Sequence, residues 1–153
     1  MSKVIFQSLE DLNSKVGSEL AISPWLDISQ SMIQAFADST NDHQWIHIDS
    51  IRAKKESPYG TTIAHGFLTL SLIPYFLESC MEFPLAKSAI NYGLNKVRFP
   101  HAVNSGSRIR GRFFIQEIAE IEGGIQVEWK ISLEVEGVEK PACVAEMLIR
   151  LYF

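Results

Sequence analysis

The 153-residue chain has only two cysteines, and their placement favours neither a disulfide nor a metal site. Cys80 and Cys143 lie far apart in apolar stretches, and no Cys-x-x-Cys pair occurs. Disulfide frameworks and zinc sites use several cysteines at short, recognisable spacings. We therefore expect two reduced, buried thiols, which is the usual state of cysteine in a cytoplasmic protein.

The chain also lacks a strong charge of either sign. Fourteen Lys and Arg residues face eighteen Asp and Glu residues, which gives a net charge of −4, and like charges occur in nothing longer than pairs such as Lys54 and Lys55. Proteins that bind nucleic acid carry basic clusters to neutralise phosphates. A nucleic acid is therefore not an expected partner.

No hydrophobic run is long enough to suggest a membrane span or a signal peptide. The longest stretch without a formal charge, Ser57–Leu77, is interrupted by two prolines and several polar residues, and Met1–Leu12 contains three charges. A bilayer span or a secretory signal needs a more continuous apolar segment. We expect a cytoplasmic protein with no membrane partner.

The second half of the chain alternates apolar and polar residues with the period of a β-strand. In Ile125–Val135 the odd positions are apolar and the even positions are polar. Cys143–Phe153 alternates in the same way, and Gly137 lies between the two runs, so they are predicted to form a hairpin. Together with Ile90–Arg98 and the run 108–113, they predict four antiparallel strands.

The first half has helical periodicity instead. Ile28–Thr40 places apolar residues on one helical face, and Ser29 or Asp27 can cap its N-terminus. A second helix is predicted over residues 64–81, apolar nearly all round and so buried on most sides, where Pro74 can bend it. The whole 153-residue chain is then one α+β domain with a hot-dog fold, an antiparallel sheet wrapped around a long buried central helix.

Reactive side chains are concentrated directly after the first helix, in Asn41–Asp49. Asp42 and His47 can act on one water as general acid and base if the intervening turn brings them together. One alternative is that the acids are turn or cap residues and the histidines are solvated. Another is a metal site of His43 and His47 with the flanking acids, but the i, i+4 spacing aligns ligands only on a helix, and this segment is predicted to be a turn.

A glycine marks the start of the second helix. Gly66 lies within Ile63–Leu68, and the first amides of a helix have no partner inside it. A glycine also lets a ligand approach the backbone closely, so the Gly66 amide can donate to a carbonyl oxygen. The alternative is that Gly66 only permits close packing of the helix against the sheet.

These two segments resemble the signature of the MaoC-like dehydratases, the R-specific enoyl-CoA hydratases. The matching residues are 36–49 and 61–68, and Ile90–Pro100 makes the chain more similar to the nodulation protein N branch. The resemblance extends from about Val16 to the C-terminus. It implies a hot-dog homodimer that adds water to trans-2-enoyl-CoA thioesters to give (3R)-hydroxyacyl-CoA, with no cofactor and no metal.

The resemblance also implies roles for individual residues. The family's catalytic Asp falls on Asp42, its catalytic His on His47, and its carbonyl-binding amide on Gly66. Many members have Asn two residues after the catalytic Asp, where this chain has Gln44, so Gln44 is expected only to support binding. The residues expected to border the substrate are Gln44, Trp45, His65, Phe67, Leu68 and Ser71. For His65 a structural role, and for the apolar residues a place in the core, are alternatives.

Other functions remain open on the same fold. A thioesterase would direct water to the carbonyl carbon, although the pairing of Asp42 with His47 favours hydration. A subunit that binds acyl thioesters without catalysis is a further alternative. Arg108, Arg110 and Arg112 alternate along one strand and could meet the phosphates of coenzyme A, but a solvated strand face is the more common meaning of such a stripe.

Overall fold

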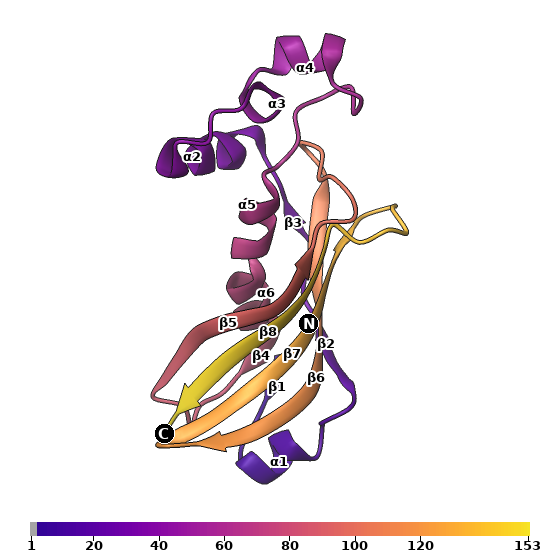
Figure 1. Ribbon diagram of the computed structural model, residues 1–153. Helices are drawn as coiled ribbons and strands as arrows, with labels where there is room; N and C mark the ends of the chain where they lie inside the picture. The colour runs from indigo at the N-terminus through magenta and orange to yellow at the C-terminus, as the bar shows by residue number, and fades with distance from the viewer. Residues whose placement is uncertain (1–2) are drawn as a thin grey trace.

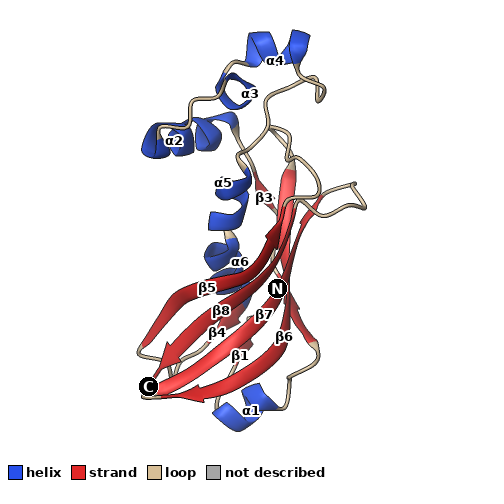
Figure 2. Ribbon diagram, viewed as in Figure 1, coloured by secondary structure: helices blue, strands red, loops and turns tan. Residues whose placement is uncertain are grey.

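A computed structural model describes residues 3–153 and shows a long, curved antiparallel sheet packed against a central helix (Figures 1 and 2). In spatial order the main path of the sheet is β2 (Glu19–Ile22), β6 (Arg108–Ile121), β7 (Gly124–Val135), β8 (Cys143–Tyr152) and β5 (Ser88–Arg98). A short strand, β3 (Leu26–Asp27), also pairs with β6. The predicted hot-dog fold and its four long strands are confirmed.

The sheet buries the face that the alternating pattern predicts. Along β7 every second side chain is buried, and Trp129 at its centre lies opposite Ile115 of β6 and Met147 of β8. Successive side chains of a strand point to opposite faces, so one face of β7 packs on the helix and the other faces out. The predicted β7–β8 hairpin is confirmed, and Gly137 in its connection has a φ of 73°.

The central helix is divided into α5 (Gly66–Ser71) and α6 (Ile73–Cys80), which follow one another along the sheet (Figure 1). The interruption at Leu72 comes two residues before Pro74. Proline has no N–H to donate to the carbonyl of Leu70 and its ring crowds that carbonyl, so the turn tightens and the Leu72 amide donates to the Thr69 carbonyl at 3.3 Å. The predicted irregularity at Pro74 is confirmed.

The expectation that this helix is buried on most sides is wrong. Ile73 and Phe76 are fully buried against the sheet, but Phe67 is 69% exposed, and Ser71 and Tyr75 are exposed with it. Residues four apart lie on one side of a helix, so these three form a continuous stripe. The helix is therefore buried on the sheet side only, because a single sheet can cover only one side of it.

Three helices extend beyond the end of the sheet: α2 (Gln30–Thr40), α3 (Trp45–Ile48) and α4 (Ser50–Glu56), drawn at the top of Figure 2. Ser29 caps α2 by accepting a hydrogen bond from the Met32 amide at 3.2 Å, as predicted. The segment predicted as a turn after α2 instead contains α3, a single helical turn. Asp49 follows α3 and caps α4 by accepting from the Arg52 amide at 2.8 Å.

The opposite end of the molecule is closed by the N-terminal elements. β1 (Val4–Ile5) pairs in parallel with β4 (Met81–Glu82), and α1 (Leu9–Asn13) lies beside the end of the sheet. Both cysteines are free and buried, as predicted, and burial raises the pKa of each thiol to about 11. Within residues 3–153 no helix is long and apolar enough to cross a bilayer.

Candidate active site

Asp42, His47 and His65 meet where the α2–α4 segment joins the start of the central helix. One ligand atom of each lies within 4.8 Å of the others. Asn41 ends α2 in the left-handed region, with a φ of 57°, a conformation that asparagine tolerates better than most residues. This reversal places Asp42 beside the later elements, and α3 then directs His47 inwards. The pairing of Asp42 with His47 expected from their spacing is thus present.

His47 is held in one orientation with one ring nitrogen free. Its side chain is 8% exposed, and Nδ1 lies 2.7 Å from the main-chain oxygen of Ile63. A carbonyl oxygen can only accept, so Nδ1 carries the proton and Nε2 keeps its lone pair. Burial lowers the pKa of His47 below its ordinary value of 6.5, although the Ile63 carbonyl acts against this. The ring is therefore a neutral acceptor at pH 7.

The backbone of His47 is fixed by residues that the sequence did not single out. Gln30 of α2 donates from Nε2 to the His47 carbonyl at 2.8 Å, and the Thr62 hydroxyl donates to Oε1 of the same Gln30. The amide of Ile63 donates to the Ile46 carbonyl at 3.1 Å. In sequence, Gln30 is one polar residue in the first turn of a helix, and nothing in the local pattern reveals its partners.

Asp42 offers an accessible carboxylate beside this buried ring. Its side chain is 55% exposed, and its Oδ2 lies 4.0 Å from Nε2 of His65. The main-chain oxygen of Asp42 accepts a hydrogen bond from that same Nε2 at 3.0 Å. The cluster thus combines an exposed carboxylate with a buried neutral imidazole, which is an arrangement suited to general acid–base work on a bound water.

Gly66 is the first residue of α5, and His65, at the N-cap, makes no side-chain capping bond. The Gly66 amide therefore has no partner within the helix and is available to an acceptor. A β-carbon at this position would lie 3.0 Å from the ring of Phe99. Close packing against Phe99 is thus a second reason for glycine here, so the expected packing role is present beside the proposed amide role.

The other residues expected to border the substrate lie around this cluster. Gln44 is exposed, and Trp45 is half-buried under the guanidinium of Arg52, 4.3 Å from the ring centroid. Leu68 is buried, whereas Phe67 and Ser71 lie on the exposed stripe of the central helix. These two residues border an open face of the chain and not an enclosed tunnel.

A metal site built on His43 and His47 is not assembled. His43 lies on the exposed side and its Nε2 is 2.8 Å from Oδ1 of Asp38, while the carboxylate of Asp49 caps α4. In the cluster of Asp42, His47 and His65, the imidazoles are stacked, and Nε2 of His65 is used by the Asp42 carbonyl. Metal ligands need lone pairs that converge on one point, so this geometry favours proton transfer.

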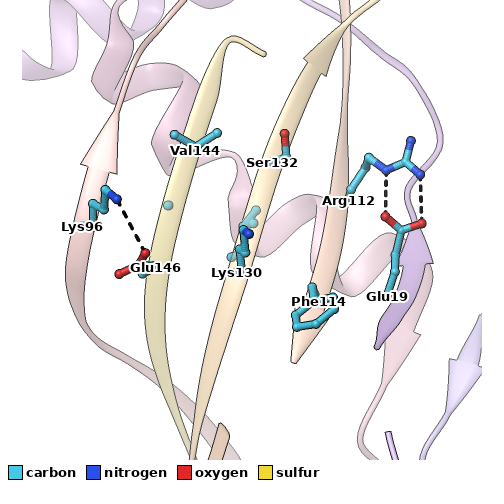
Figure 3. A pocket seen from close by; sticks show the side chains of 10 residues that line it. Glu19, Lys96, Arg112, Phe114, Lys130, Ser132, Val144 and Glu146 are labelled. Atoms are coloured by element: carbon cyan, nitrogen blue, oxygen red, sulfur yellow. Dashed lines mark hydrogen bonds and ion pairs between the residues drawn. The ribbon is translucent and has the colours of Figure 1, made fainter. Parts of the chain in front are cut away.

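The arginine stripe lies on the outer face of the sheet and is paired with carboxylates. Arg108 donates to Glu136, Arg110 to Glu134 at 2.7 Å, and Arg112 to Glu19 at 2.8 Å. Figure 3 shows Arg112 beside Glu19 and Lys96 beside Glu146. These four residues line a hollow of about 440 Å³ on this face. Because these arginines are already paired with carboxylates, the structure favours a solvated strand face and not a binding site for the phosphates of coenzyme A.

Comparisons with known sequences extend the geometric result. Residues 11–136 match the MaoC like domain family. The chain is 46% identical over 146 residues to 3-hydroxyacyl-thioester dehydratase Z of Mycobacterium tuberculosis (strain ATCC 25618 / H37Rv), covering 95% of this chain and 96% of that protein. It is 44% identical over 143 residues to nodulation protein N of Rhizobium meliloti (strain 1021), covering 92% of this chain and 89% of that protein.

Solved structures show the same fold. A MaoC-like dehydratase from Rhodospirillum rubrum matches with a TM-score of 0.76 and 21% identity over 94% of this chain and 95% of that one. The (R)-hydratase from A. caviae involved in PHA biosynthesis matches with a TM-score of 0.71 and 22% identity over 95% of this chain and 99% of that one. At these identities the likeness concerns the fold alone.

Proposed function

The chain belongs to the MaoC-like dehydratase family, and from this we propose that it is a hydro-lyase that interconverts trans-2-enoyl thioesters and (3R)-hydroxyacyl thioesters. A relative that is 46% identical is a 3-hydroxyacyl-thioester dehydratase. The observation that carries the proposal is the exposed carboxylate of Asp42 beside His47, whose Nε2 is free and whose ring is buried. We take coenzyme A as the thioester carrier.

In the direction of hydration, Asp42 and His47 hold one water. The carboxylate accepts one hydrogen bond from this water, and Nε2 of His47 accepts the other. As the water oxygen bonds to the β-carbon, its proton moves to Nε2, where the imidazole acts as general base. The fixed Nδ1–H bond to the Ile63 carbonyl keeps the accepting nitrogen on the side of the cluster.

The amide of Gly66 completes the reaction. The electron pair of the double bond moves towards the thioester carbonyl, and the developing enolate oxygen accepts a hydrogen bond from the Gly66 N–H. The proton on His47 then passes to the α-carbon and the carbonyl re-forms. The water has then been added across the double bond, and His47 has returned to its neutral form. No electron leaves or enters the substrate, so the reaction needs no redox cofactor.

The acyl chain has room along the central helix. Gly66, Leu70, Pro74 and Leu77 lie on one side of the central helix, because each is three or four residues from the next. Further along this face a cavity of about 560 Å³ lies between α6, β5 and β8. Its apolar lining includes Leu77, Met81, Trp129, Ile149 and Leu151. We place the far end of the acyl chain in this cavity, with Phe67 and Ser71 beside its path.

A second copy of the chain is the partner that this face requires. Among the described residues, β5 pairs only with β8, so its other edge is open, and Tyr92 on it is 54% exposed. Ile90 and Leu94 on β5 and the stripe of Phe67 and Tyr75 add further exposed apolar surface. A long apolar edge strand is a template for pairing. A symmetric dimer across β5 would cover this surface and enclose the open side of the site.

The reaction is tested by incubating the protein with trans-2-enoyl-CoA substrates of several chain lengths. Hydration predicts loss of the enoyl absorbance and formation of the (3R)-hydroxyacyl product without release of a free thiol. Thiol release would show a thioesterase. Saturable binding of every substrate without turnover would show a binding subunit, and either result would overturn the proposal.

A further inference from the structure

His65 is a buried residue that contacts both Asp42 and His47 and directly precedes Gly66. Its side chain is 3% exposed, so it lies beneath the site and not in the substrate's path. Its Nε2 donates to the main-chain oxygen of Asp42 at 3.0 Å, and its ring stacks on that of His47 with 3.7 Å between centroids. It also directly precedes Gly66, as the N-cap of α5.

These contacts restrain His47 in a direction that its own hydrogen bond does not. The bond from Nδ1 to the Ile63 carbonyl acts in the plane of the imidazole. The stacked ring of His65, at an interplanar angle of 26°, limits movement out of that plane. Phe36 lies next to His65, with 5.0 Å between ring centroids, and supports it. A group whose rotation is blocked in both directions keeps its lone pair aimed at one point.

The hydrogen bond from His65 to Asp42 restrains the segment between α2 and α3. Asp42 is exposed and follows the left-handed Asn41, and the hydrogen bond from His65 reaches it across 23 residues of sequence. By holding the Asp42 carbonyl, His65 fixes how far the carboxylate lies from His47. Its Nδ1 is buried without a partner, and burying an unpaired polar atom is unfavourable. Packing alone would be served better by an apolar side chain.

We infer that His65 is a positioning residue that sets the spacing of Asp42, His47 and the Gly66 amide, and that it does not bind substrate. This inference rests on the proposed function for its catalytic readout. Its structural content, the hold of His65 on the His47 ring, is measurable without any substrate.

Three variants separate the contacts of His65. His65→Phe keeps a ring against His47 but loses the donor, His65→Gln keeps a donor within reach of Asp42 but loses the ring, and His65→Leu loses both. We expect the Leu variant to lower kcat about 10²-fold with little change in KM, the scale expected for misplaced groups, and the Phe and Gln variants to fall between it and the wild type. His43→Gln is the matched control, because His43 bonds only the exposed Asp38 in this region. It should retain wild-type kcat.

Side-chain NMR of His47 gives the second readout. The wild type should show one tautomer, protonated at Nδ1, and the Phe variant should largely keep it. The Gln and Leu variants should show exchange between tautomers and a changed titration. An unchanged His47 spectrum in the Leu variant overturns the inference, even if the wild type hydrates no substrate and the proposed function fails. Should the Leu variant not fold, wild-type kcat in both the Phe and Gln variants overturns it equally.

Discussion

At the scale of single residues, His47 combines burial with a free ring nitrogen. Its ring is held by the Ile63 carbonyl on one edge and by His65 on one face, while Nε2 remains available beside Asp42. The carboxylate of Asp42 beside it is 55% exposed. The site therefore presents two acceptors in different environments, one desolvated and one solvated, to the same small volume.

The lowered pKa of His47 predicts the acid limb of the pH profile. Hydration needs the neutral ring, so kcat/KM should rise with pH through a pKa below 6.5 and stay level above it. An acid limb with a pKa at or above 6.5 would contradict the assignment of His47 as the base.

The same lowered pKa predicts how the stability of the fold depends on pH. His47 binds a proton more readily in the unfolded chain than in the folded one. Its contribution to the free energy of unfolding is therefore fully present above pH 6.5 and is lost as the pH falls towards the lowered pKa.

The amide of Gly66 is tested by substitutions that separate its donor from its size. Gly66→Pro removes the N–H at a first-turn position where proline is tolerated, and it should cost about 3 to 4 kcal/mol of transition-state stabilisation. Gly66→Ala keeps the donor, but its methyl would lie 3.0 Å from the Phe99 ring, so it should also lower kcat/KM.

Phe99→Leu supplies the control for that prediction. Combined with Gly66→Ala it should restore activity, because it removes the crowding, whereas combined with Gly66→Pro it should not. Melting curves establish first that each variant is folded. Equal rescue of both variants would show that Gly66 is only a packing residue.

At the scale of elements, the sequence predicted what local periodicity determines. β7 and β8 bury one face, so their alternation identified them, and the Ser29 cap identified the start of α2. α4 was not predicted, because a short helix of mostly charged residues has no apolar period and depends on its Asp49 cap. The contact of His65 with Asp42 and the anchoring role of Gln30 depend on tertiary placement, which no local pattern encodes.

The hydrogen bonds by which Gln30 of α2 holds the His47 carbonyl of α3 can be tested by substitution. Gln30→Ala removes both hydrogen bonds of that amide and leaves the His47 carbonyl and the Thr62 hydroxyl without their partner. We expect a loss of about 1 to 3 kcal/mol in the free energy of unfolding, together with a lower kcat. Gln34→Ala, one turn further along α2, removes only an exposed bond to Asp38 and should change stability by less than about 0.5 kcal/mol. Equal effects in denaturant titrations would contradict the anchoring role.

At the scale of the whole molecule, the central helix has one side that the sheet covers and one side that is exposed. The sheet wraps one side of the central helix, while the stripe from Phe67 to Tyr75 and the outer edge of β5 are open. The proposed site opens on this uncovered side, next to Phe67. Covering it with a second copy would bury apolar surface and exclude water from the reacting atoms at the same time.

Sedimentation tests this arrangement. The wild type should sediment as a dimer of the 17.3 kDa chain at micromolar concentration. Tyr92→Lys or Leu94→Lys should shift it to monomer, because a charged edge strand resists pairing. Ile51→Lys alters another exposed apolar residue, on α4, and should leave the dimer intact. A wild type that is monomeric and fully active would show that the site needs no second copy.

The most direct measurement is the rate of enoyl-CoA hydration by Asp42→Asn and His47→Gln beside the wild type. Asp42→Asn keeps the shape of the side chain, and His47→Gln keeps a polar side chain but loses the ring. Neither amide can take up a proton at neutral pH. Each should lower kcat by at least about 10²-fold, the lower end of general acid–base contributions, with a melting transition close to that of the wild type. Wild-type turnover in either folded variant would contradict the central claim, because the water would then be activated without that residue.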